Sequence, residues 1–182
     1  MLEIKIPMGP ELWDEEKEEF VEPEYKTVKL EHSLVSIYKW ESKWNKPFLS
    51  SMDKTPEQNL DYVRCMCMTQ NTDPEIFTHL SKDNMDAITS YIQAPMTATT
   101  IAEDPLERNS RPEILTAEVI YYYMIALNIP FECQKWHLNQ LLMLIKVCSE
   151  KNKPQKKLSM AELAARNKAL NEERRRKMGS KG

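Results

Sequence analysis

Apolar residues are densest in the second half of the chain, where two long runs repeat them at the three- and four-residue spacing of helices. The runs are Glu113–Leu127 and Phe131–Cys148, and Pro130 between them lacks a backbone donor and restricts the residue before it. Almost no charge follows Glu118 in the first run. The pattern predicts a helix, a sharp corner and a second helix with Trp136 in the core. We expect the first helix to be buried on most faces and the rest of the domain to pack on this pair.

Near the N-terminus the pattern changes to alternation, which is typical of half-buried strands. Leu2–Ile6 alternates with charged residues and is closed by Pro7, and Tyr25–His32 alternates in the same way. We expect these segments to pair as a small hairpin-like sheet that leans on the helices, because an isolated two-stranded ribbon is marginally stable. The acidic stretch between them, Glu11–Glu24, predicts an exposed loop or a weak turn of helix.

Helix-start signals divide the middle of the chain. Ser33–Trp44 fits a helix capped by a serine, although its first half could equally extend the preceding strand. Thr55 and Gln58 form a capping-box pattern around a proline at the first helical position. We expect the helix that they open to end near residues 70–72.

Two further starts follow. Asp73, before a proline, predicts a short helix, and Ser81 predicts a longer one that is stopped by Pro95. Thr97–Thr100 is β-like by propensity, though short. Residues 102–111 predict a polar loop ahead of the central pair.

The last stretch predicts a separate basic arm. A break surrounds Pro154, and Ser159 begins a capping-box pattern that opens a final helix with a thin apolar stripe. Such a stripe suits a helix docked on a partner, or a detached arm. The expected fold class is therefore mainly α. It comprises a compact helical domain at residues 1–153, whose N-terminal β-hairpin-like element covers about residues 1–32, and a separate C-terminal helix at residues 154–182.

Composition supports this organisation. At 182 residues the chain is long enough for one domain plus tails, which buries roughly 70% of its unfolded surface. A content of 41% hydrophobic and 29% charged residues argues against a wholly disordered chain. A count of only 3 glycines favours helices over sandwiches and barrels. The 11 methionines suit an adaptable core, and they also suit a surface that binds partners.

The two ends of the chain carry opposite charge. Between Glu11 and Glu24 the acidic residues face a single base, Lys17, whereas from Lys146 onward basic residues predominate. This asymmetry predicts head-to-tail self-association or docking on a charged partner. The run Arg174–Lys177 fits a solubilising helix end, a protein contact or phosphate binding. Nucleic acid is the weakest of the three, because no aromatic residues are present there to stack on bases.

No motif in the chain predicts a reaction. The histidines, His32, His79 and His137, lie in unrelated elements, and no His/Cys cluster has zinc spacing. Phosphate loops, nucleophile elbows and dinucleotide fingerprints are missing from the sequence. We therefore expect no enzyme activity, no cofactor and no metal.

The cysteines and the hydropathy indicate a reducing compartment. All four cysteines are expected to be buried free thiols: Cys65, Cys67, Cys133 and Cys148. The N-terminus lacks the pattern of a secretory signal, and no apolar run reaches membrane-spanning length. We expect the protein in the cytoplasm where it is made.

Several pieces of the chain carry a resemblance to a known family. They are LEHSL at Leu30–Leu34, KWESKW at Lys39–Trp44, PMTATT at Pro95–Thr100, IPFEC at Ile129–Cys133, KWHL at Lys135–Leu138, and in the arm Arg166-Asn167, Ala169-Leu170-Asn171 and the Arg174–Arg176 run. With these pieces the chain resembles, over nearly its full length, a family of small proteins of long-tailed bacteriophages. The family belongs to the tail-morphogenesis group called tail assembly chaperones.

The resemblance implies a non-enzymatic role in the host-cell cytoplasm. Such proteins coat the long helical tape-measure protein, keep it soluble, recruit tail-tube subunits and are displaced as the tube grows. The candidate protein-contact residues lie in the final helix: Leu163, Leu170, Arg174, Arg175, Arg176 and Lys177. Two alternatives stay open. One is a permanent virion subunit of the tail or head–tail junction, and the other is a nucleic-acid-binding regulator that uses the basic tail.

Overall fold

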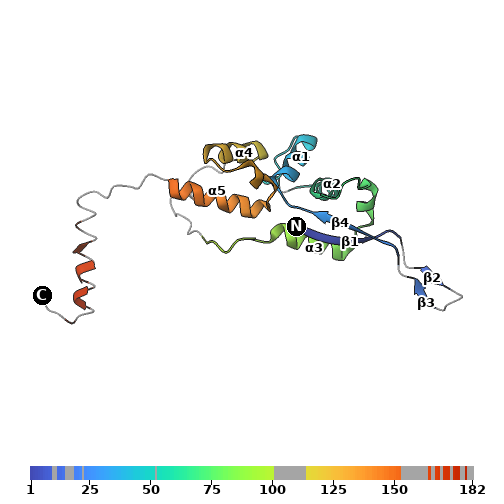
Figure 1. The fold of residues 1–182 in the computed structure, drawn as a ribbon, viewed down its shortest axis with the longest axis horizontal. Coiled ribbons are helices and arrows are strands. Elements are labelled where there is room, and N and C mark those ends of the chain that lie inside the picture. The colour runs from blue at the N-terminus through green and yellow to red at the C-terminus, as the bar shows by residue number, and fades with distance from the viewer. Residues whose placement is uncertain are drawn as a thin grey trace. The chain divides into compact units, whose positions relative to one another are not determined.

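The computed structural model describes residues 1–9, 12–14, 19–21, 23–51, 53–100 and 114–152, with residues 164, 167–168, 170–172, 174–176 and 179 of the arm. The chain divides into two units, Met1–Glu150 and Lys151–Gly182. Figure 1 shows the elements, which in chain order are β1 (Leu2–Pro7), β2 (Leu12–Asp14), β3 (Glu19–Val21), β4 (Tyr25–Leu30), α1 (Leu34–Trp44), α2 (Pro56–Met66), the 3-10 helix η1 (Pro74–His79), α3 (Lys82–Gln93), α4 (Ala117–Ala126), the 3-10 helix η3 (Phe131–Lys135) and α5 (Leu138–Asn152).

The N-terminal strands pair as the alternating sequence pattern predicts. β1 and β4 pair antiparallel, in a register that places Leu2 opposite Leu30 and Pro7 opposite Tyr25. The apolar positions of the alternation make up its buried face: Ile4, Ile6, Val28 and Leu30. The fold is thus mainly helical with a small N-terminal β element, as the sequence predicts.

The acidic stretch departs from the predicted loop or helical turn. β2 and β3 pair antiparallel, with Leu12 opposite Val21 and Trp13 opposite Phe20. These two short strands flank the most acidic residues of the stretch.

The ambiguous segment after β4 is a helix, and it organises the domain. The Ser33 hydroxyl caps α1 by accepting a hydrogen bond from the Ser36 amide at 3.3 Å. Leu34, Ile37 and Trp40 are fully buried, and α1 packs against α2, α4 and η3. The prediction that everything packs on the α4–α5 pair is therefore wrong, because α1 connects more of the elements.

α2 begins at the predicted capping box and ends earlier than predicted. The Thr55 hydroxyl accepts from the Gln58 amide at 3.2 Å, and the Gln58 side chain accepts from the Thr55 amide at 3.0 Å. The helix stops at Met66 because the chain there pairs with the strand end. Met68 donates its amide to the carbonyl of Lys29 at 2.8 Å.

η1 and α3 begin where the sequence predicts. The side chains of Asp73 and Ser81 accept from amides in the first turn of each helix. α3 runs along β1 (Figure 1), and the Asn84 side chain donates to the carbonyl of Lys5 at 3.1 Å. The β-like expectation for Thr97–Thr100 is wrong, because these residues are irregular and have no strand partner in the described ranges.

The second run of the central pair is divided. It forms η3 and then α5, with a break at Trp136 and His137. The break arises because His137 forms a bridge with Ser33 and the Leu138 amide donates to the carbonyl of His32 at 2.7 Å. Tertiary pairing thus interrupts a segment that is helical by pattern.

The remaining predictions concern the thiols, the loop and the arm. All four cysteines are free, but the prediction that all are buried is wrong for three of them: Cys133 is buried, whereas Cys65, Cys67 and Cys148 are half-buried. The expected loop at residues 102–111 lies outside the described residues. In the second unit the helical residues are Ala164, Asn167, Lys168, Leu170–Glu172 and Arg174–Arg176. Across the described ranges no helix is long and apolar enough to cross a membrane.

Candidate protein-binding surface

α4 exposes much of its apolar surface, contrary to the prediction that most of its faces are buried. Its inward face consists of Ala117, Ile120 and Met124. Tyr122 and Ile125 leave 65% and 62% of their surface exposed. The prediction failed because apolar residues occupy every side of this helix, so the pattern does not indicate which side packs.

Exposed rings continue this surface onto neighbouring elements. The ring of Tyr121 lies 6.1 Å from that of Tyr38 on α1 and 6.4 Å from that of Phe131 on η3, between centroids. Phe131 is 52% exposed. We call Tyr38, Tyr121, Tyr122, Ile125 and Phe131 the α4 surface. Clustered apolar and aromatic side chains at a protein surface indicate a site for another protein.

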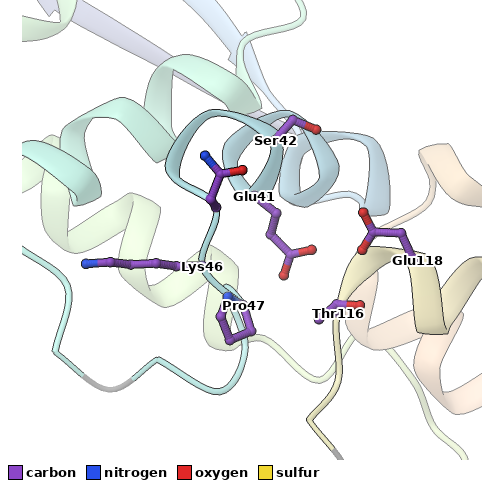
Figure 2. Close-up of a pocket in the computed structure, with 7 residues that line it drawn as sticks. Glu41, Ser42, Lys46, Pro47, Thr116 and Glu118 are labelled. Atoms are coloured by element: carbon purple, nitrogen blue, oxygen red, sulfur yellow. The ribbon is translucent and has the colours of Figure 1, made fainter.

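One buried carboxylate holds α4 on α1. Glu41 accepts from the Ala117 amide through Oε2 and from the Phe48 amide through Oε1, each at 2.7 Å. Figure 2 shows this carboxylate pointing from α1 into the space between Pro47 and Thr116. Both oxygens are engaged by backbone donors. The pocket of about 300 Å³ around Glu41 therefore lies at the joint between α1 and α4.

α5 adds further apolar surface. Only Leu138 and Leu141 are buried, and the next apolar side chains are half-buried: Leu142, Met143, Leu144, Ile145 and Val147. Leu142 and Met143 line a shallow pocket of about 260 Å³ together with Pro95. The Asn139 side chain fixes this arrangement by donating to the carbonyl of Ala94 at 2.8 Å.

A buried polar junction joins the end of β4 to the start of α5. His32 Nδ1 lies 2.5 Å from the hydroxyl of Tyr62, and the rings of His32 and His137 are 5.1 Å apart. His137 donates from Nε2 to the Tyr91 carbonyl at 3.0 Å, and the Tyr91 hydroxyl donates to Glu31 at 2.7 Å. Sequence reasoning placed these histidines in unrelated elements and missed the junction, because sequence spacing carries no signal for such distant contacts.

Burial favours the neutral forms of His32 and Tyr62. It lowers the pKa of His32 to about 4, and the nearby His137 acts in the same direction. Burial also raises the pKa of Tyr62 well above its usual value, and Cys65 and Glu31 add to that effect. A neutral imidazole and a neutral phenol that satisfy each other fit a structural role.

Trp136 lies at the surface beside this junction and not in the core as predicted, with 43% of its area exposed. The extended backbone at Trp136 leaves His137 as the residue that is buried. Trp136, Met96 and Glu31 line one pocket of about 450 Å³. The LEHSL, PMTATT and KWHL pieces therefore each contribute a residue to the same place.

The candidate residues of the arm are partly described. Leu170 is 42% exposed, and Arg174–Arg176 are exposed on helical backbone. Leu163 and Lys177 lie outside the described residues. These residues belong to the second unit, whereas the α4 surface belongs to the first.

The first unit is a mainly helical domain with an exposed aromatic surface. Within the described ranges, no group of three or more His, Cys, Asp or Glu residues could hold a metal ion. Comparisons with protein-family models, with curated proteins and with solved structures find no match.

Proposed function

We propose that this protein is a non-enzymatic tail assembly chaperone of a bacteriophage that acts in the host-cell cytoplasm. The observation that carries the proposal is the exposure of Tyr122, Ile125 and Phe131 on adjoining elements. The aromatic and aliphatic side chains of this patch, beside the exposed Glu118, suit the apolar face of a partner helix. The resemblance supplies the partners, which are the tape-measure protein and the tail-tube subunits.

The chemistry of this surface suits reversible binding. Tyrosines provide rings for apolar contact, while their hydroxyls can remain hydrated when the surface is empty. The half-buried Leu142 and Met143 of α5 add adaptable contacts. Such a surface holds varied apolar helices and releases them when tube subunits compete for them.

We assign a second contact to the arm. The exposed Arg174–Arg176 run and Leu170, all on helical backbone, offer charge and an apolar side chain. Leu163 and Lys177 extend the same segment in the sequence. This contact would engage an acidic part of a partner, or the acidic end of a second copy.

Co-expression with the tape-measure and tail-tube proteins, followed by affinity capture, tests the proposal. Tyr122→Ser with Ile125→Ser should reduce tape-measure capture at least about tenfold, because buried aromatic anchors contribute about 2 kcal/mol or more each. Tyr25→Ser removes an exposed ring from β4 and is the matched control, which should bind like the wild type. Failure of the wild type to capture either protein, or equal capture by the double variant, would refute the proposal.

Mass spectrometry of mature particles beside infected-cell lysate separates the alternatives. A chaperone is present in the lysate and lost from particles, whereas a stoichiometric amount in particles would assign a permanent role in the tail or head–tail junction. Salt-sensitive DNA binding that disappears when residues after Lys157 are removed would instead favour a nucleic-acid-binding regulator.

A further inference from the structure

A polar pocket of about 470 Å³ lies between α1, the last turn of α2 and the loop that leads into η1. Its lining includes Lys43 from α1, Arg64 from α2, and Thr69, Asn71 and Thr72 from the loop. None of these residues belongs to the α4 surface. The pocket therefore offers a site that is independent of the proposed chaperone function.

Charge in this pocket is unbalanced. Lys43 Nζ lies 2.5 Å from Asp61 Oδ1, and the second oxygen of Asp61 accepts from the Trp44 indole at 2.9 Å. Arg64 forms no ion pair with any described residue. One positive charge, on the Arg64 guanidinium, is thus left without a partner in the described part of the chain.

The same guanidinium also contains an unsatisfied donor. Arg64 Nε is buried and has no hydrogen-bond partner in the described structure. A buried donor without an acceptor is destabilising, and more so on a charged group. Nε–H and a neighbouring Nη–H form the edge of arginine that holds two oxygens of a carboxylate or phosphate together. A rotation about the last side-chain bonds would turn this edge toward the pocket.

We propose that the pocket binds one oxyanion, a carboxylate or a phosphate, with Arg64 as its anchor. Thr69 Oγ1 accepts from the Lys29 amide at 3.0 Å, which leaves its own hydrogen to donate to a bound oxygen. The Asn71 side chain lines the same space and can supply a neutral amide donor. The single net charge and the limited volume fit one anionic group and exclude a polyanionic chain from the pocket.

Titration of the full chain at constant ionic strength tests this site. One arm uses sodium phosphate and the other a short glutamate-rich peptide, and ¹⁵N NMR follows the Arg64 Nε–H signal. We expect a saturable shift of that signal and a rise in Tm with at least one of the two. Arg64→Gln should weaken the affinity at least about tenfold, because the charge-assisted pair of bonds is lost. Lys46→Gln, in the pocket beside Glu41, is the control and should bind normally.

The two arms identify the source of the anion. A response to phosphate alone assigns a phosphate site, a response to the peptide alone assigns a side-chain carboxylate, and both responses support the shared chemistry. The proposal is overturned if neither ligand shifts the Arg64 signal, or if Arg64→Gln binds the ligand as tightly as the wild type does. The NMR titration uses the wild-type chain, so a folding defect of the variant cannot obscure the result. Tape-measure capture should be unchanged in Arg64→Gln, which separates this site from the chaperone proposal.

Discussion

β4 and α4 are both rich in apolar residues, yet their sequences indicate their packing very differently. In β4, Val28 and Leu30 alternate with exposed residues, and these two are the buried ones. In α4, Ile120 is buried while Ile125 is exposed, and only Glu118 in the first turn marks the outer face on which Ile125 lies. A segment indicates its inner face only where polar residues mark the outer face. The single charge of Glu118 leaves most of the outer face of α4 unmarked, so the sequence does not distinguish its exposed apolar residues from core residues.

The first prediction compares a buried ring with an exposed one. Trp40 is fully buried, and its indole donates to the carbonyl of Gln58 at 2.9 Å. Trp40→Ala should destabilise the domain by about 3–5 kcal/mol, whereas Tyr122→Ala should change stability by no more than about 0.5 kcal/mol. Urea unfolding followed by circular dichroism measures both. A large loss of stability in Tyr122→Ala would show that the outer face of α4 is packed, and would remove the contrast with β4.

The second prediction concerns the buried polar junction. The unfolded chain binds a proton at His32 below about pH 6.5, whereas the folded chain binds it only below about pH 4. The unfolded state therefore holds more protons in this window, so the stability present above pH 6.5 is lost as the pH falls. His32 should account for a loss of about 3 kcal/mol by pH 4.

Urea unfolding between pH 7 and pH 4 measures this loss. His32→Gln should flatten the pH dependence relative to the wild type, and His79→Gln, at an exposed position, should leave it unchanged. The difference between the two variants is the readout, because other groups titrate in the same range. If the free energy of unfolding depends on pH equally in both variants, His32 is not held neutral by burial.

Local signals explain which parts of the fold the sequence predicts. The starts of α2 and α3 depend on Thr55 and Ser81, whose side chains bond to amides three residues away. The end of α2 was not predictable, because Met66 stops the helix by pairing with a distant strand. The burial of His137, where the sequence predicts Trp136 in the core, has the same cause, because His137 forms a bridge with the distant Ser33.

The candidate site divides in the same way. The sequence indicates that α4 is apolar, but its exposure depends on which side α1 covers. Leu170 and Arg174–Arg176 were predicted as contacts from charge and a thin stripe, and that role stays a prediction. Arg64 gave no sequence signal, because an unpaired guanidinium is recognisable only once its surroundings are folded.

The last prediction tests how α4 is attached. Glu41→Ala would leave the buried amide of Ala117 and the amide of Phe48 without their shared acceptor, at a cost of about 2 kcal/mol. Because this carboxylate joins α4 to α1, the loss should appear first as local opening of α4. Hydrogen exchange should become faster at the α4 amides and stay slow in β1 and β4. Ser42→Ala, at the exposed neighbouring position, should leave both regions unchanged. Uniformly faster exchange throughout the domain would mean that α4 opens only with the whole core, and that the α4 surface is as rigidly attached as the β1–β4 ribbon.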